Sequence, residues 1–220
     1  MSRTITRLFD DYDNARAAVN ELERMGIPHG DLSLVANNAH GRHAAPGRDS
    51  ADHDHDHHHH DGHDHDHGEI GAGASTGAVV GGLGGLLAGL GLLAIPGLGP
   101  IVAAGWLAST AVGAAIGGGV GAAAGGLVDA LRKEGHSEDE ANVYSEGVRR
   151  GGTLVSARVN DDRVGEVEAV LDGNGGVSAD TRGTDYRRAG WTAFDRNAAP
   201  YTAEEVDRER DVYRREPTGA

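Results

Sequence analysis

Apolar positions near the start of the chain follow the spacing of a helix and lie between two short apolar runs. The run over residues 4–10 carries Ile5, Leu8 and Phe9 and predicts a strand. Asp13 is placed to cap a helix, which Gly26 closes and Pro28 prevents from continuing. A second short strand is predicted over residues 32–35. The helix between the two strands has five apolar residues on one face: Ala15, Ala18, Val19, Leu22 and Met25.

A related pattern returns in the second half of the chain. Ser137 and Glu140 form a capping box, S-x-x-E, that predicts a helix through about residue 150. Alternating apolar residues predict a strand over 153–159, and a helix over 164–171 follows, capped by Asp161 or Asp162. A last short strand is expected from Val177. Two βαβ-like halves predict an α+β fold, a ferredoxin-like split βαβ sandwich whose halves pack together because neither can form a core alone.

The centre of the chain contains no charged residue from 70 to 128. Small residues recur there every four positions, on both sides of a turn at 95–100. Such a row leaves a helix face without side chains, so that a second helix can approach closely. The pattern predicts that an apolar glycine-zipper α-helical hairpin interrupts the sandwich. The helix-packing residues are Gly73, Gly77, Gly81, Gly85, Gly89, Gly105, Gly113, Gly117, Gly121 and Gly125.

The predicted hairpin is long enough to cross a lipid bilayer. About 20 residues at ~1.5 Å each cover the ~30 Å hydrocarbon core, and two crossings return the chain to its starting side. Arg132, Lys133, Arg149 and Arg150 follow the second arm and favour the cytoplasmic side. We expect a homo-oligomer in the bacterial cytoplasmic membrane, with both soluble halves in the cytoplasm. A cytoplasmic, soluble oligomer that buries the hairpin is the alternative.

Composition divides the chain into five parts. Residues 1–38 and 133–183 are the two halves of the α/β domain, and 70–132 is the hairpin. Residues 39–69 form a His/Asp-rich linker. Residues 184–220 form a charged tail, in which Thr202 and Glu205 predict a short solvated helix.

The linker is dense in groups that bind transition metals, because neutral imidazole and carboxylate both ligate zinc, nickel and cobalt. Its spacing defines no single tetrahedral site. Three interpretations remain open: an acidic linker with incidental metal affinity, a metal-buffering or sensing segment, and a pH response in which nine histidines titrating near ~6.5 offset seven aspartates. The candidate metal ligands are His53, His55, His57, His58, His59, His60, His63, His65, His67, Asp54, Asp56, Asp61, Asp64 and Asp66.

Charge and composition narrow the function classes. The formal net charge of −14 argues against nucleic-acid binding, and the lack of cysteine removes thiolate chemistry. No arrangement of catalytic residues is recognisable, so we expect no enzyme activity, no required cofactor and no small-molecule substrate. His136 is expected to cap a helix or lie in solvent.

Several segments resemble a known family. Residues 26–35, the turn at 93–100 and the run at 140–159 are similar to the bacterial heat-induced, YflT-like general stress protein domain, and residues 190–205 are similar to a tail found in some of its members. The resemblance implies a small, stress-associated bacterial protein of unsettled biochemistry and brings no catalytic residues. The histidine stretch departs from the family pattern, so the resemblance supports no metal role.

Overall fold

The computed structural model describes residues 2–43, 86–95, 97–110 and 126–215. This part of the chain mixes helices with one five-stranded antiparallel sheet, which confirms the α+β class. In chain order the elements are β1 (Ser2–Phe9), α1 (Tyr12–Arg24), η1 (His29–Asp31), β2 (Leu32–Asn37), η2 (Leu86–Gly89), β3 (Gly91–Ile95), β4 (Gly99–Gly105), α3 (Gly126–Lys133), α4 (Glu138–Arg149), β5 (Thr153–Asn160), η4 (Asp161–Arg163), α5 (Val164–Gly173), α6 (Ala179–Arg188) and α7 (Ala203–Arg215).

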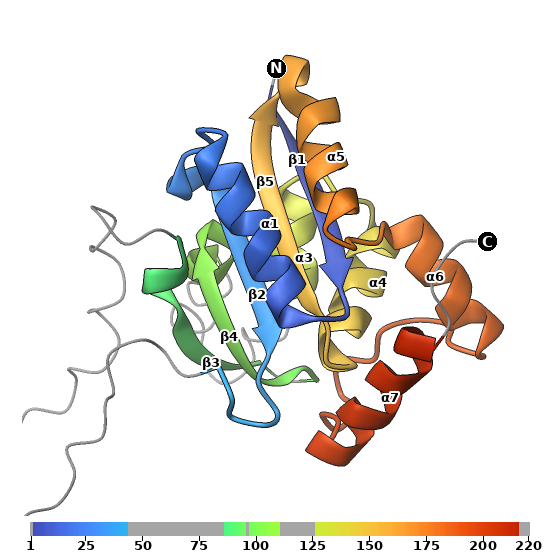
Figure 1. Cartoon of the computed structure of the whole chain (residues 1–220). Coiled ribbons are helices and arrows are strands. Elements are labelled where there is room, and N and C mark those ends of the chain that lie inside the picture. The colour runs from blue at the N-terminus through green and yellow to red at the C-terminus, as the bar shows by residue number, and fades with distance from the viewer. Residues whose placement is uncertain (1, 44–85, 96, 111–125, 216–220) are drawn as a thin grey trace, which may run out of the picture.

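The sheet joins the two halves of the chain. Its strand order is β1-β5-β2-β4-β3, and every pair of neighbours is antiparallel. Strand β5 comes from the second half and lies between β1 and β2 of the first half, so β1 and β2 run parallel to each other (Figure 1). The halves therefore pack together, as expected from their small individual cores.

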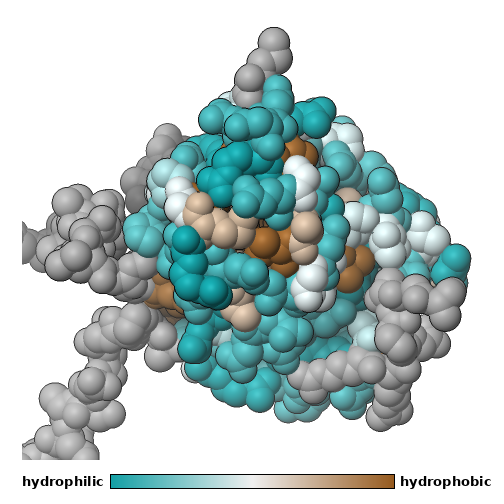
Figure 2. All heavy atoms as spheres, turned by 45° about the horizontal axis from the view of Figure 1, so that its top comes forward, coloured by the Kyte–Doolittle hydropathy of each residue, from teal (hydrophilic) through white to brown (hydrophobic). Residues whose placement is uncertain are grey.

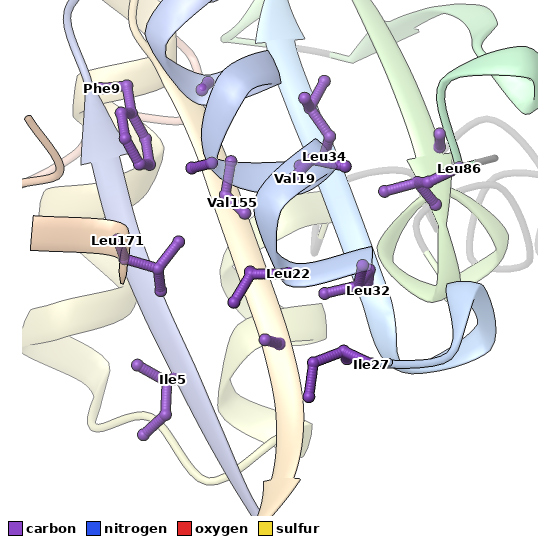
Figure 3. Close-up of a cluster of buried hydrophobic side chains, with 14 of the residues drawn as sticks. Ile5, Phe9, Val19, Leu22, Ile27, Leu32, Leu34, Leu86, Val155 and Leu171 are labelled. Atoms are coloured by element: carbon purple, nitrogen blue, oxygen red, sulfur yellow. The ribbon is translucent and has the colours of Figure 1, made fainter. Parts of the chain in front are cut away.

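Helices cover both faces of the sheet. Alternation along β1 sends Ile5 and Phe9 to the face beneath α1 and α5, where they join a cluster with Leu22 and Leu171 (Figure 3). Leu8 points to the opposite face, which α3, α4 and α6 cover. The molecular face in Figure 2 is mainly hydrophilic, with a small hydrophobic area at its centre. Most apolar side chains of the described residues thus lie in two layers, one on each side of the sheet.

The predicted helical hairpin is wrong where the structure describes it. The turn at 95–100 is correctly placed, but the strands β3 and β4 flank it, and Gly89 lies in the short 3₁₀ helix η2. β4 completes the sheet beside β2 and buries Ile101 and Val102, whereas a glycine-rich helix would lose ~1 kcal/mol per glycine relative to alanine. The other predicted zipper residues lie outside the described residues: Gly73, Gly77, Gly81, Gly85, Gly113, Gly117, Gly121 and Gly125.

Gly105 has a different role from the predicted one. It ends β4 with φ +79, a left-handed backbone conformation, and pairs with Ser33. A Cβ atom there would collide with the carbonyl oxygen of Leu32 and lie 2.9 Å from the Cα of Ser33. Close approach of two strands, rather than of two helices, requires this glycine. Within the described residues, no helix is both long enough and apolar enough to cross a bilayer.

The helix caps in the structure agree only in part with those predicted from the sequence. The Ser137–Glu140 capping box is present, and Gly26 has φ +85. The N-cap of α1 is Asp11 instead of Asp13, because the Asp11 carboxylate accepts hydrogen bonds from the backbone amides of Asp13 and Asn14 in the first turn. At the start of α5, residues 161–163 form a 3₁₀ turn in which neither predicted aspartate caps the helix.

The end of the chain also differs from its prediction. Val177 forms only a single bridge with Leu8, after which the chain turns into α6. The predicted capping box of the tail is present, since the Thr202 amide donates to the Glu205 carboxylate at 2.8 Å. However, α7 is not a solvated helix: Val206 is fully buried, and Arg210 donates to the carbonyl of Gly151 at 2.6 Å.

Candidate binding groove at the β1 edge

A groove of about 840 Å³ runs along the outer edge of β1. One wall is α5, with Val164 and Glu168. The other wall comprises the α3–α4 connection and α4, with His136 and Tyr144, and the start of α6 lines the groove at Ser178. β1 is the last strand of the sheet on this side, so the groove lies where a further strand would pair.

The backbone of β1 turns hydrogen-bonding groups toward this groove. Leu8 and Val177 exchange both backbone hydrogen bonds, at 2.9 and 2.8 Å, so the amide and carbonyl of Leu8 point away from β5. Backbone direction alternates along an antiparallel strand, and the amides and carbonyls of Thr6 and Thr4 therefore face the groove as well.

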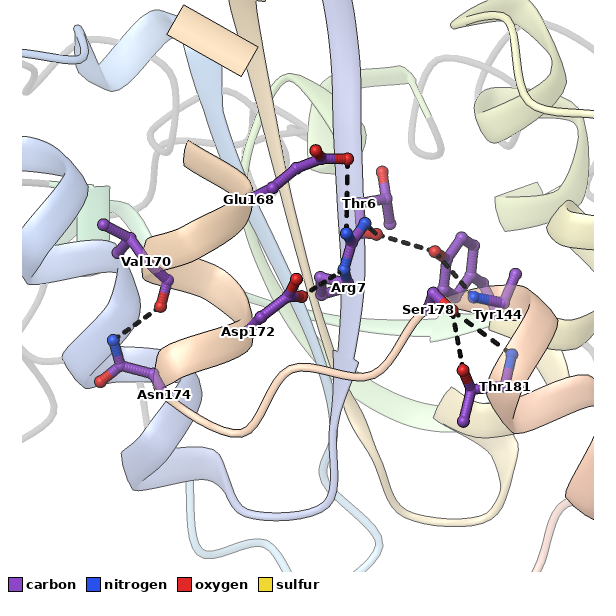
Figure 4. A network of polar contacts seen from close by, with 10 residues as sticks. Thr6, Arg7, Tyr144, Glu168, Val170, Asp172, Asn174, Ser178 and Thr181 are labelled. Atoms are coloured by element: carbon purple, nitrogen blue, oxygen red, sulfur yellow. Dashed lines mark hydrogen bonds and ion pairs between the residues drawn. The ribbon is translucent and has the colours of Figure 1, made fainter. Parts of the chain in front are cut away.

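A connected set of polar groups forms the inner part of the groove. The Thr6 hydroxyl lies 2.8 Å from Nε2 of His136 and 2.9 Å from the hydroxyl of Ser156. The Tyr144 hydroxyl donates to the carbonyl of Thr6 at 2.7 Å and accepts from the amide of Ala179 at 3.2 Å (Figure 4). Thr6 and Ser156 are buried and face each other across a pair without backbone hydrogen bonds, where side chains come closest.

Burial sets the protonation of the two titratable groups in this set. Burial lowers the pKa of His136, although the carboxylates of Glu140 and Glu134 act in the opposite direction. Burial also raises the pKa of Tyr144 to about 12, against the opposing effect of Arg7. Both groups are therefore neutral at pH 7 and serve as hydrogen-bonding groups rather than as charges.

Charges around the groove are balanced and largely paired with each other. Arg158 forms a two-pronged pair with Glu134, which also accepts from the Thr4 hydroxyl at 3.4 Å. On the other wall, Arg7 donates to Asp172 at 2.6 Å and lies 3.4 Å from Glu168 (Figure 4). The lining contains four cations, Arg3, Arg7, Lys133 and Arg158, and four anions, Glu134, Glu140, Glu168 and Asp180. Such a lining favours an uncharged polar ligand over a strongly charged one.

The groove was not predicted from the sequence. His136 was expected to cap a helix or lie in solvent, yet its side chain is only 9% exposed and contacts Thr6. One signal was available: Thr6 and Ser156 place hydroxyls at positions of the strand pattern that face the interior. An inward-facing polar residue needs a partner, and here the partners come from segments far away in the chain.

The predicted metal ligands, residues 53–67, lie outside the described residues. Among the residues that the structure does describe, no group of three or more histidine and acidic side chains is arranged to hold a metal ion. No family model, curated protein or solved structure matches the chain.

Proposed function

We propose that the protein is a non-enzymatic bacterial stress protein that self-associates through its apolar centre, with a ferredoxin-like core as its folded scaffold. Two features support the ferredoxin-like scaffold. β5 lies between the parallel strands β1 and β2, and β1 in turn lies between β5 and Val177. The helices that follow β1 and β5, α1 and α5, pack on the same face of the sheet.

The edge that β3 forms in the described part of the sheet is the observation that carries the proposal of self-association. β3 is the last strand of the described sheet, its sequence GLLAI has no charge, and Leu92 is 63% exposed. Natural edge strands are usually protected by charged residues, prolines or bulges, because an open edge pairs readily with another chain. An uncharged edge with an exposed leucine is therefore suited to association.

The hydrogen-bonding register of β3 is self-complementary. Ala94 lies opposite Pro100, which has no amide hydrogen and whose carbonyl accepts from Asn38 on the other side at 2.8 Å. The backbone groups of Ala94, and by alternation those of Leu92, therefore point outward. Two antiparallel copies of β3 centred on Leu93 would pair each Leu92 with the Ala94 of the other copy. This two-fold arrangement supports a homo-oligomer built on strand pairing.

Contact with lipid is a second part of the proposal, in a revised form. Residues 106–110 and the start of α3 at Gly126 both belong to the described fold, and 15 residues separate them in the sequence. A helix of 15 residues extends about 22 Å, less than the ~30 Å hydrocarbon core. We therefore propose association with the surface of the cytoplasmic membrane through uncharged segments, instead of two crossings. Extraction of membranes with alkaline carbonate should release the protein, and retention in the pellet would contradict surface association.

Self-association is tested by changing the outer edge of β3 alone. Ala94→Pro removes an outward amide but no β3–β4 hydrogen bond, because Ala94 faces Pro100. Analytical ultracentrifugation of the full chain should show an oligomer whose dissociation constant rises about tenfold or more in Ala94→Pro. Ala94→Val keeps the amide and should associate like the wild type. A monomeric wild type, or equal association of the proline variant, would refute the proposal.

The stress role requires a test in cells. In a strain that lacks the protein, the wild type and Ala94→Val should restore survival after heat shock. Ala94→Pro should fail to restore survival if association through β3 is needed for the role. Full rescue by Ala94→Pro, together with impaired association in vitro, would separate the oligomer from the stress function.

A further inference from the structure

We propose that the groove beside β1 binds an extended, uncharged polypeptide segment, which adds to the sheet as a further strand in line with Val177. This binding site is distinct from the self-association edge, since β1 and β3 lie at opposite ends of the sheet (Figure 1). The ligand class follows from the backbone groups that face the groove, its dimensions and its charge.

The backbone groups at the β1 edge form an interrupted ladder. Val177 already pairs with Leu8, and the Tyr144 hydroxyl donates to the carbonyl of Thr6, where the amide of an added strand would otherwise bond. The amide of Thr6 and both backbone groups of Thr4 also face the groove, and no described residue bonds to them on that side. A peptide strand supplies the alternating donors and acceptors that these groups require.

The dimensions of the groove suit a short strand. Residues 2–6 of β1 extend over about 13 Å, at ~3.3 Å per residue. The volume of about 840 Å³ lies within the range of ordinary ligand sites. Side chains of an added strand would alternate between the α5 wall, at Val164, and the α4 wall, at His136 and Glu140.

The charge of the groove selects against strongly charged peptides. Its arginines are engaged with carboxylates of the protein: Arg158 with Glu134, and Arg7 with Asp172 and Glu168. A charged ligand that bound at Arg7 or Arg158 would have to break one of these pairs and leave a partner uncompensated. Backbone hydrogen bonds would therefore supply most of the affinity, while neutral polar side chains meet Thr6 and His136.

The test separates backbone pairing from side-chain contacts at one position. Phage-displayed linear peptides are selected on the full-length protein, and enriched peptides are synthesised with a fluorescent label. Thr4→Pro removes an outward amide without removing a β1–β5 hydrogen bond, so it should weaken binding about tenfold or more. Thr4→Val keeps the backbone and loses only the hydroxyl, and it should bind within about threefold of the wild type.

Two further variants control for folding and for the opposite edge. Val164→Trp fills part of the α5 wall without touching the β1 backbone and should also weaken binding. Ala94→Pro changes the other edge of the sheet and should bind peptides normally. Circular dichroism confirms that each variant is folded. The proposal is overturned if no peptide is enriched on the wild type over Thr4→Pro, or if enriched peptides bind Thr4→Pro and Val164→Trp as tightly as the wild type.

Discussion

Replacing Gly105 by alanine gives the sharpest contrast between the strand pairing described here and a helical glycine zipper. In a helix, glycine to alanine would be favourable by ~1 kcal/mol unless the packing is close. At the end of β4, the same change forces alanine into φ +79 and places its Cβ against the backbone of Leu32 and Ser33. The matched control is Gly26→Ala, which has a similar φ of +85 but nothing within 4 Å of the added Cβ.

The expected loss can be worked out from these contacts. Both variants pay roughly 1–2 kcal/mol for a left-handed alanine. Only Gly105→Ala must also move β4 away from β2, because backbone atoms cannot rotate away from the added methyl group. That movement disturbs the Ser33 hydroxyl, which donates to the carbonyl of Ala104 at 2.9 Å and accepts from the amide of Leu107 at 3.2 Å. At ~1 kcal/mol for each of these two hydrogen bonds, the total loss for Gly105→Ala is about 3–4 kcal/mol.

Urea denaturation followed by circular dichroism measures both variants. We expect the free energy of unfolding to fall about 2 kcal/mol further in Gly105→Ala than in Gly26→Ala, with a Tm lower by several degrees. A Gly105→Ala variant that is as stable as Gly26→Ala, or more stable than the wild type, would refute the strand arrangement. It would instead favour the helical interpretation of this glycine.

Three further predictions address the groove, the tail and the linker. Burial lowers the pKa of His136 below its ordinary ~6.5, so its contribution to stability is complete above pH ~6.5 and is lost as the pH falls below that value. The His136→Gln variant should therefore lose less stability between pH 7 and pH 5 than the wild type. Parallel pH profiles of the two proteins would contradict this. Val206→Asp places a charge in a fully buried site and should release α7 from the core. Limited proteolysis would detect this release as faster cleavage. The control Val212→Asp, at a residue that is 52% exposed, should leave the cleavage rate unchanged. Titration calorimetry with zinc should show several weak equivalents that vanish on deletion of residues 49–67, and one tight equivalent would contradict the interchangeable-ligand interpretation.

Local signals in the sequence were sufficient for the elements whose cause is local. The 3.6-residue spacing of apolar side chains located α1, and strict alternation located β5. The capping box at Ser137 and the helix-ending role of Gly26 were also predictable. Each of these depends on residues a few positions apart, so the signal is contained in a short stretch of sequence.

The central segment was predicted wrongly because its pattern of small residues is compatible with both a helix and a strand. Small residues every four positions make a smooth helix face, but the same residues in a strand allow close approach to a neighbouring backbone. The apolar run from Leu92 to Val102 has no polar positions to reveal a period of two. Pairing of β4 with β2 decides the outcome, since it satisfies the strand backbone against residues about 70 positions away.

By itself the sequence determined the α+β class, the two related halves and the division between polar and uncharged segments, because these follow from composition and short-range periodicity. The tertiary structure alone decided that β5 inserts between β1 and β2 and that the centre of the chain extends the sheet. It also decided that Thr6 contacts both His136, which lines the groove with it, and the buried Ser156. These three residues lie up to 150 positions apart, and no local preference brings them together. Their contact forms only when the strands of the sheet pair with each other. The free energy of that pairing comes from every strand, so no single segment of the sequence encodes it.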